Sequence, residues 1–153
     1  MFKIREAQIT DALSIQKLVN IYAAKGKMLP LSLNDVYERI LEFVVCEIKD
    51  EIIGCCALHP TWEDLAEIRS LAVDNRYQGQ DIGQKMVKLN IEKAENLGFK
   101  RVFALTYKPN FFKKLGFYEI DKGDLPKKIW TDCLKCIKFP NCDEIALIYI
   151  INK

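Results

Sequence analysis

The fold is decided by one stretch, Glu67-Ile68-Arg69-Ser70-Leu71-Ala72-Val73-Asp74-Asn75-Arg76-Tyr77-Gln78-Gly79-Gln80-Asp81-Ile82-Gly83. Residues 65–73 form a β-rich run that predicts a strand, and residues 74–81 form a polar loop. From Ile82 onward, apolar residues recur at helical spacing until Gly98 ends the pattern. Unpaired N–H groups and the positive end of the helix dipole meet where such a helix begins, so the turn over residues 78–83 could cradle a pyrophosphate. Alone this is weak evidence, because glycine-containing turns often only reverse the chain.

The sequence on both sides of this stretch alternates between predicted strands and helices. Upstream we expect a strand over 2–6, a helix capped by Thr10, a second helix over 33–41 and a hairpin of 43–48 with 52–58. The apolar face of the first helix is formed by Ile15, Leu18, Val19 and Tyr22. Ser32 lies three residues before Asp35 and predicts a capping box for the second helix. Downstream we expect strands over 101–107, 117–120 and 145–151, with a short helix over 109–115.

Length and composition indicate one globular domain over residues 1–153. Half of the residues are hydrophobic and the formal net charge is only +2, which excludes long disorder and a bulk attraction to nucleic acid. We find no apolar run of signal-peptide or membrane-span length. We therefore expect a cytoplasmic protein with no nucleic-acid partner and no membrane partner.

The six cysteines, without an export signal, argue for reduced thiols or metal ligands rather than disulfides. Cys46, Cys55 and Cys56 lie in apolar runs, and we expect them to be small core residues. The other three are Cys133, Cys136 and Cys142. The first two are separated by two residues, as in a zinc knuckle, but a structural zinc site usually has four ligands. We therefore favour reduced loop cysteines over a zinc site and expect catalysis to need no metal.

The stretch around the loop resembles the GNAT superfamily of N-acetyltransferases, whose acyl-CoA signature is Q/R-x-x-G-x-G/A. Here it reads Gln78-x-x-Asp81-x-Gly83, with Asp81 at the middle glycine. Asp tolerates a left-handed backbone better than most residues but brings negative charge near a diphosphate. Residues 71–73 precede the loop at the distance usual in this family. Residues 111–117 resemble the family's later helix and the Gly-Phe turn that follows it. The resemblance implies an α+β GNAT fold: a mostly antiparallel twisted sheet of about six or seven strands, splayed at an acyl-CoA cleft and flanked by about four helices.

The same resemblance implies acetyl-CoA as the donor and assigns residues that bind it. These are Leu71, Ala72, Val73, Gln78, Gly79, Gln80, Asp81, Ile82, Gly83, Gln84, Asn110 and Phe112.

For catalysis, the resemblance places a general base at Glu67, acting through a water. The alternative is a structural carboxylate paired with Arg69. A backbone N–H near Ala72 or Val73 would polarise the thioester carbonyl. Many relatives protonate the leaving thiolate with a tyrosine, where this chain has Phe112. Tyr107 or a water held by Asn110 could take that role, or the thiolate could leave without a dedicated acid.

Several blocks resemble the short stand-alone N-acetylglutamate synthases of bacterial arginine biosynthesis, among them residues 55–59, 61–73, 101–107 and 125–130 through 142–144. The acceptor amine would then belong to L-glutamate. Its two carboxylates need cationic or hydrogen-bonding partners, and an arginine guanidinium can bind a carboxylate through two parallel hydrogen bonds. Arg69 is the leading candidate, with Lys27 and Ser70 behind it. The resembling synthases usually read Leu-Pro-Arg-Ser where this chain reads Leu29-Pro30-Leu31-Ser32, so one carboxylate-binding arginine is missing.

Other readings stay open at this point. The acceptor could be another small amine or a protein N-terminus, because the same scaffold serves many acceptors. With Asp81 in the loop and no helix tyrosine, the chain could also be a non-catalytic acyl-CoA-binding module. The apolar run 145–151 could mediate a homodimer or be a buried central strand.

Overall fold

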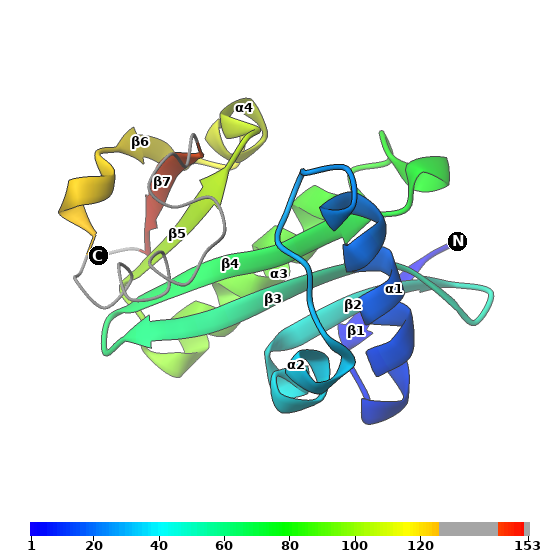
Figure 1. Cartoon of the computed structure of the whole chain (residues 1–153). Helices are drawn as coiled ribbons and strands as arrows, with labels where there is room; N and C mark the ends of the chain where they lie inside the picture. The colour runs from blue at the N-terminus through cyan, green and yellow to red at the C-terminus, as the bar shows by residue number, and fades with distance from the viewer. Residues whose placement is uncertain (126–143, 152–153) are drawn as a thin grey trace. The chain divides into compact units, whose positions relative to one another are not determined.

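The structure, a computed structural model, describes residues 1–125 and 144–151 (Figure 1). The strands are β1 (Lys3–Glu6), β2 (Phe43–Ile48), β3 (Glu51–Trp62), β4 (Leu65–Val73), β5 (Arg101–Thr106), β6 (Tyr118–Ile120) and β7 (Ile145–Ile150). The helices are α1 (Ala12–Ala23), α2 (Leu33–Glu38), α3 (Ile82–Leu97) and α4 (Pro109–Lys113). Short 3-10 turns are η1 (Ile9–Asp11), η2 (Ile40–Glu42), η3 (Asn75–Tyr77) and η4 (Lys122–Asp124).

These elements divide into two compact units. The first contains Met1–His59 and Ile68–Lys93, and the second contains Pro60–Glu67 and Ala94–Lys153. Strands β3 and β4 and helix α3 contribute residues to both units, so neither unit is a continuous stretch of chain.

In the first unit, the predicted hairpin of β2 and β3 is confirmed. The two strands pair antiparallel from Phe43↔Ala57 to Ile48↔Glu51. The turn residues Lys49 and Asp50 have φ angles of 50° and 66°, the left-handed conformation that matches the twist of a tight hairpin. β3 continues beyond the predicted end at residue 58, because its later residues still have neighbouring strand β4 to pair with.

The N-terminus of α1 differs from the prediction. Thr10 does not cap the helix, since it lies inside η1. Asp11 determines the local structure instead: its carboxylate accepts the N–H of Gln8 at 2.7 Å and the guanidinium of Arg5 at 2.8 Å. The Arg5 hydrogen bond lowers the pKa of Asp11. Arg5 also binds Glu47 of β2 at 2.6 Å, so this cluster joins β1, β2 and the start of α1.

The capping box of α2 is confirmed. The N–H of Asp35 donates to Ser32 Oγ at 3.0 Å, and the N–H of Ser32 donates to Asp35 Oδ2 at 3.1 Å. The helix is shorter than predicted because Arg39 leaves the helical conformation, with φ −111° and ψ 12°. The chain continues as η2, where the carboxylate of Glu42 lies 3.0 Å from His59 Nδ1.

One face of the strands in the first unit packs against α1, α2 and the loop between these helices. The predicted apolar face of α1 is confirmed, because all four of its residues are buried there. The cluster consists of Ala12, Ile15, Leu18, Val19, Tyr22, Leu31, Val36, Phe43, Val45, Cys55, Ala57 and Ala72. The alternating positions of β2 and β3 in this list follow from the period of two along a strand.

The opposite face packs against α3. A Cβ on Gly54 would lie 3.1 Å from Met86 Cε, so the helix approaches β3 closely at that glycine. Asn90 is fully buried, and its Nδ2 donates to Cys56 Sγ at 3.2 Å. The thiols of Cys46, Cys55 and Cys56 are free and buried, which confirms the predicted core role. Burial raises the pKa of all three thiols, to about 12 for Cys56.

In the second unit, β7 is an inner strand. It pairs antiparallel with β5 from Arg101↔Ile150 to Thr106↔Ile145 on one edge, and with β6 on the other. Its middle residues are buried, as expected for the buried strand that we weighed against an intermolecular role, and the homodimer stays a prediction. One face carries an apolar cluster of Leu65, Phe103, Leu125, Ala146 and Ile148.

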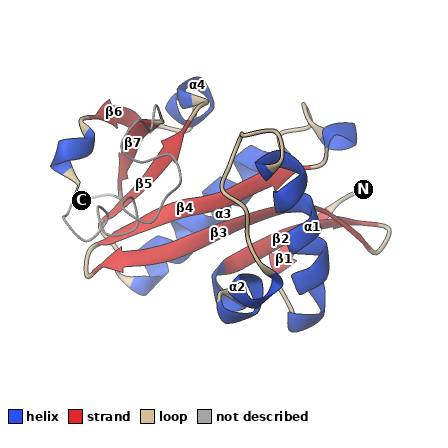
Figure 2. Ribbon diagram, viewed as in Figure 1, coloured by secondary structure: helices blue, strands red, loops and turns tan. Residues whose placement is uncertain are grey.

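Together the strands form a seven-stranded sheet in the order β1-β2-β3-β4-β5-β7-β6 (Figure 2). β4 and β5 run parallel, whereas the pairs β1–β2, β2–β3, β5–β7 and β6–β7 are antiparallel. The predicted α+β class with a mostly antiparallel sheet is therefore confirmed. Within the described part of the chain, no helix combines the length and apolar character of a membrane span.

Candidate functional site

Strand β4 has an irregular backbone at a predicted site residue. Ser70 has a φ of 55°, a left-handed conformation that is uncommon for a residue with a side chain and that interrupts regular strand geometry. Its carbonyl accepts a hydrogen bond from the Cys55 thiol at 3.3 Å. Such residues concentrate at functional sites, where the surrounding structure holds them in place. Ser70 and its neighbour Arg69 are both half-buried.

The β4–α3 loop, residues 74–81, carries further left-handed residues. Gly79 has a φ of 86° and Asp81 a φ of 63°. The signature residue that is glycine in the resembling family therefore takes a backbone conformation that glycine favours, and Asp81 adopts it with an exposed side chain. The predicted tolerance of Asp81 for this conformation is confirmed.

Helix α3 begins directly after this loop. The carbonyl of Asp81 accepts the N–H of Lys85 at 3.0 Å, which is the first hydrogen bond of the helix ladder. The N–H groups of Ile82, Gly83 and Gln84 belong to the first turn, whose donors have no partner within the helix. These donors and the helix dipole suit an anionic group, so the residues present fit the pyrophosphate of an acyl-CoA.

The loop is held from the side of α1 by a tyrosine that the sequence assigned only to the core. The Tyr22 hydroxyl donates to the carbonyl of Val73 and lies 3.0 Å from Asn75 Oδ1. Gln78 Nε2 donates to the Tyr22 hydroxyl and to the Val73 carbonyl, both at 3.0 Å. We predicted that Gln78 binds the donor, but its side-chain amide binds Tyr22 and Val73 of the same chain. A tyrosine at the end of an apolar helix face was the available signal, because a buried hydroxyl needs a partner.

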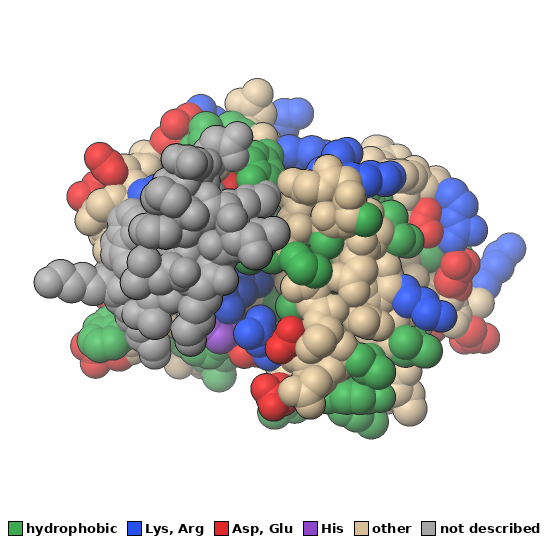
Figure 3. All heavy atoms as spheres, viewed as in Figure 1, with side chains coloured by type: hydrophobic (Ala, Val, Ile, Leu, Met, Phe, Trp, Pro, Cys, Tyr) green, Lys and Arg blue, Asp and Glu red, His purple; other side chains and the backbone are tan. Residues whose placement is uncertain are grey.

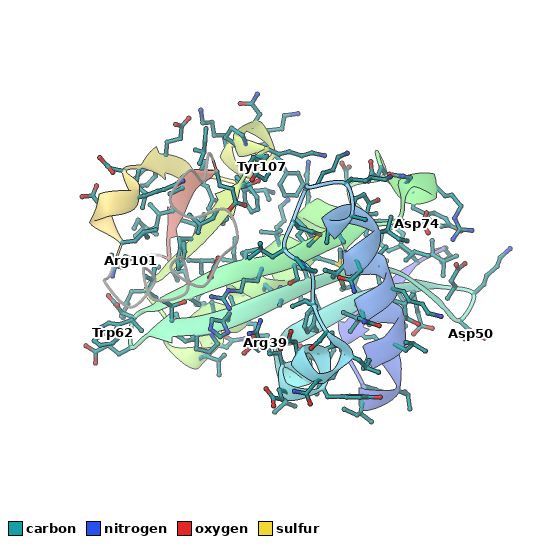
Figure 4. The ribbon with its side chains drawn as sticks, viewed as in Figure 1. Arg39, Asp50, Trp62, Asp74, Arg101 and Tyr107 are labelled. Atoms are coloured by element: carbon teal, nitrogen blue, oxygen red, sulfur yellow. The ribbon has the colours of Figure 1, made fainter. Side chains whose placement is uncertain are left out.

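The other side of the loop is held by an exposed ion-pair cluster. Arg76 Nη2 lies 2.8 Å from Glu51 Oε2 in the β2–β3 hairpin and 2.9 Å from Asp74 Oδ2. The Asp74 carboxylate also accepts the N–H of Arg76 at 2.9 Å, and its pKa is lowered by Arg76. Figure 4 shows Asp74 at the start of the loop and Asp50 in the hairpin turn. In Figure 3, basic and acidic side chains are mixed around this hairpin.

The α1–α2 loop, residues 24–32, carries the predicted acceptor residue Lys27, which is exposed. Its beginning is tied to α1 by the N–H of Lys27, which donates to the carbonyl of Tyr22 at 3.0 Å. Its end is tied by Asn20, whose side chain donates to the carbonyl of Leu31 at 2.9 Å and accepts the N–H of Leu31 at 3.0 Å. Leu31, at the position of the missing arginine, is only 8% exposed and belongs to the apolar core.

The remaining predicted residues belong to the second unit. Glu67 is 8% exposed and pairs in register with Phe103 of β5. Because Glu67 and Leu65 are two residues apart in one strand, they share a face of the sheet. Tyr107, labelled in Figure 4, follows β5, and it is 37% exposed.

Helix α4 places the last predicted residues in different environments. Asn110 is exposed, whereas Phe112 is 4% exposed. The Phe112 ring packs edge-on against Phe111 and Phe117, with centroids 5.0 and 5.1 Å apart. Phe112 is therefore a core residue of the second unit.

The structure thus places the candidate residues in two sets. The β4–α3 loop, Ser70, Arg69 and Lys27 lie in the first unit, and Glu67, Tyr107, Asn110 and Phe112 lie in the second. Among the described residues, no group of His, Cys, Asp or Glu is arranged to hold a metal ion. The late cysteines, Cys133, Cys136 and Cys142, lie outside the described residues.

The chain is similar in sequence to known acetyltransferases. Residues 15–117 match the model of the acetyltransferase (GNAT) family. An uncharacterized N-acetyltransferase of Chlorobaculum tepidum is 42% identical over 149 residues, which cover 95% of this chain and 94% of that protein. An amino-acid acetyltransferase of Mycobacterium tuberculosis is 34% identical over 150 residues, which cover 96% of this chain and 86% of that protein.

A solved structure is similar along the whole chain. It is the N-acetylglutamate synthase of Neisseria gonorrhoeae, complexed with coenzyme A and N-acetyl-glutamate. The TM-score is 0.91 at 26% sequence identity, and the match covers 100% of this chain but 36% of that longer one. The likeness agrees with the fold that the loop signature predicted.

Proposed function

This chain belongs to the acetyltransferase (GNAT) family and is an acetyl-CoA-dependent N-acetyltransferase, and from that premise we propose that its acceptor is the α-amine of L-glutamate. The proposal rests above all on similarity that extends over nearly the entire chain. The amino-acid acetyltransferase of M. tuberculosis matches 96% of it, and the fold of a synthase complexed with N-acetyl-glutamate matches all of it.

In this proposal the donor is held by backbone rather than by side chains. The N–H groups of Ile82, Gly83 and Gln84 would bind the pyrophosphate, because they open α3 and have no partner within the helix. Gly79, Gln80 and Asp81 would shape the turn around it. Residues 71–73 of β4 would line the pantetheine arm. Acetyl-CoA supplies the acetyl group as a thioester, which an amine can attack.

Catalysis requires a neutral amine and a polarised carbonyl. Glu67 would accept the proton that the amine loses as its nitrogen bonds to the acetyl carbon, directly or through a water. The N–H of Ala72 or Val73 would donate to the carbonyl oxygen. The carbon–sulfur bond then breaks, and the departing thiolate takes a proton from Tyr107 or from a water held by Asn110. Phe112 lacks a hydroxyl and would only pack.

The acceptor side is where this chain departs from the resembling synthases. Arg69 would bind a glutamate carboxylate as a fork, assisted by Lys27 and Ser70. Leu31 cannot serve, because it is an apolar side chain packed into the core. That observation favours a second candidate, another small amine with fewer anionic groups.

The test is a thiol-release assay with acetyl-CoA and a panel of amines that contains glutamate, glutamine, aspartate and a polyamine. We expect glutamate to give the highest kcat/KM. Arg69→Ala should raise the KM for glutamate about tenfold to a hundredfold, because one charge-assisted hydrogen-bonded pair is lost. Arg69→Ala should leave the KM for glutamine less affected, since glutamine carries one carboxylate fewer.

Glu67→Gln tests the base separately. We expect kcat to fall at least about a hundredfold with little change in KM, and the loss should shrink as rising pH deprotonates the amine in solution. Glu63→Gln, which changes an exposed carboxylate between β3 and β4, is the matched control and should leave kcat unchanged. Preference for a polyamine or another amine over glutamate would reject the glutamate proposal and support the second candidate.

A further inference from the structure

Tyr22 stands out among the buried polar groups that the proposed chemistry does not use. It is 7% exposed, and it lies in the last helical turn of α1. Its ring belongs to the apolar core with Leu18 and Val19. Its hydroxyl nevertheless meets three other residues at a single point: Val73 at the end of β4, and Asn75 and Gln78 in the β4–α3 loop.

The hydroxyl of Tyr22 both donates and accepts in this network. A phenol has one proton to donate and can accept as well. Gln78 Nε2 supplies one proton to the Tyr22 oxygen and its other to the Val73 carbonyl. The Tyr22 proton is donated to the carbonyl of Val73, and Asn75 Oδ1 lies 3.0 Å from the hydroxyl oxygen. Burial raises the pKa of Tyr22, so the group stays a neutral donor throughout the ordinary pH range.

These contacts hold Val73 and Gln78, the residues on either side of the segment 74–77. Val73 ends β4, and Gln78 directly precedes the left-handed residues Gly79 and Asp81. Removing the hydroxyl would leave Gln78 with Val73 alone and Asn75 without this partner. The segment between them would then sample other backbone conformations, and so would the turn of residues 79–81 that follows Gln78. The N–H groups of Ile82, Gly83 and Gln84, which come directly after that turn, would be less well aligned for an anion.

We propose that Tyr22 is a positioning residue for donor binding: its hydroxyl, at the end of α1, holds the β4–α3 loop in the conformation that binds the pyrophosphate of acetyl-CoA. The inference rests on the proposed donor role of that loop. It is independent of which amine is the acceptor.

The first experiment measures CoA binding by calorimetry, without any acceptor, for the wild type, Tyr22→Phe and Tyr37→Phe. Tyr37 is an exposed tyrosine of α2 and loses the same hydroxyl. We expect Tyr22→Phe to raise the Kd for CoA about tenfold and Tyr37→Phe to change it less than about twofold. An unchanged Kd for the folded Tyr22→Phe protein, even with a lower melting temperature, would overturn the proposal and leave a stability role only.

A second experiment asks whether the effect depends on the pyrophosphate. Turnover is compared for acetyl-CoA and for acetyl-pantetheine, which lacks that group. The loss in kcat/KM caused by Tyr22→Phe should be about tenfold with acetyl-CoA and should nearly vanish with acetyl-pantetheine. Equal losses with both donors would contradict a role through the pyrophosphate loop.

The loop side offers an independent check if Tyr22→Phe folds poorly. Gln78→Ala removes the partner amide from an exposed position. It should raise the Kd for CoA by a similar factor, and the double variant should bind about as weakly as the weaker single variant, because both changes release one network. Fully additive losses, or wild-type binding by Gln78→Ala, would overturn the proposal. A wild type that does not distinguish CoA from pantetheine would instead reject the donor role of the loop.

Discussion

The two loops that meet the end of α1 are built differently. The β4–α3 loop is held by side chains on both sides, by Tyr22 from the helix and by Arg76 with Glu51 toward the hairpin. Both loops contain a left-handed glycine, Gly26 or Gly79, but only the β4–α3 loop also has a left-handed residue with a side chain, Asp81. The α1–α2 loop is held at its start by backbone hydrogen bonds to α1, among them that from the N–H of Lys27 to the carbonyl of Tyr22. Its end is held by the two hydrogen bonds between Asn20 and Leu31, and it leaves Lys25 and Lys27 exposed.

This difference matches the tasks that we assign to the loops. A donor that a whole family shares can be bound by backbone N–H groups at a helix N-terminus, since these groups are present whatever the side chains are. An acceptor that varies between family members can be bound by side chains on a loop, because these side chains can change without altering the fold. Asn20 and Tyr22 are two residues apart on one helix, and each holds one loop. Four predictions test this division, from the largest expected effect to the smallest.

The first prediction concerns the buried end of the α1–α2 loop. Leu31→Ala should lower the free energy of unfolding by about 2–3 kcal/mol, because it leaves a cavity in the core cluster. Chemical denaturation measures the loss. Leu29→Ala, in the same loop but 47% exposed, is the control and should cost less than about 0.5 kcal/mol. Similar costs for both variants would show that the loop is not anchored through Leu31.

The second prediction separates the loops functionally. Asn20→Ala removes both side-chain hydrogen bonds to Leu31, so we expect the KM for the acceptor to rise about tenfold while the Kd for CoA stays within about twofold. This is the reverse of the pattern expected for Tyr22→Phe. Asn34→Ala, on the exposed surface of α2, provides the control. A weakened Kd for CoA in Asn20→Ala would mean that the two loops do not act separately.

The third prediction concerns the charge and the backbone of Asp81. Asp81→Asn keeps a residue that tolerates the left-handed conformation and removes a negative charge near the proposed diphosphate site. We expect the Kd for CoA to fall by about twofold to fivefold at low salt, and the gain to diminish as salt screens the exposed charge. Asp81→Gly should give the same electrostatic gain. Weaker binding by Asp81→Asn would show that the carboxylate supports the loop.

The smallest effect is expected from the exposed ion pairs of the β4–α3 loop. Glu51→Gln removes one partner of Arg76 and leaves Asp74 in place. Because both Arg76 and Glu51 are largely exposed, we expect no resolvable change in melting temperature or in the Kd for CoA. A loss of CoA affinity as large as that of Tyr22→Phe would show that the hairpin side, and not α1, holds the loop.

Much of the fold could be predicted from periodicity and from local signals. The strand of residues 65–73, the helix from Ile82 to its end before Gly98, and the Ser32–Asp35 capping box all appear as predicted. Each depends on residues close in sequence, so the pattern carries the information. The cap at Thr10 failed because Asp11 is held by Arg5 of β1. The second helix ended early where the chain turns to bring Glu42 to His59.

The amino-acid sequence by itself determined the class of fold, the family and the loop where the donor is expected, because a glycine-containing turn between a strand and a helix is a local motif. Only the tertiary structure decided that Asp81 takes the left-handed backbone, that Leu31 is buried, and that Tyr22 braces Val73, Asn75 and Gln78. The Tyr22 contacts join residues about fifty positions apart in the chain. Hydrophobic periodicity marks a tyrosine as buried, but the partner of its hydroxyl depends on which distant segment the fold brings against it.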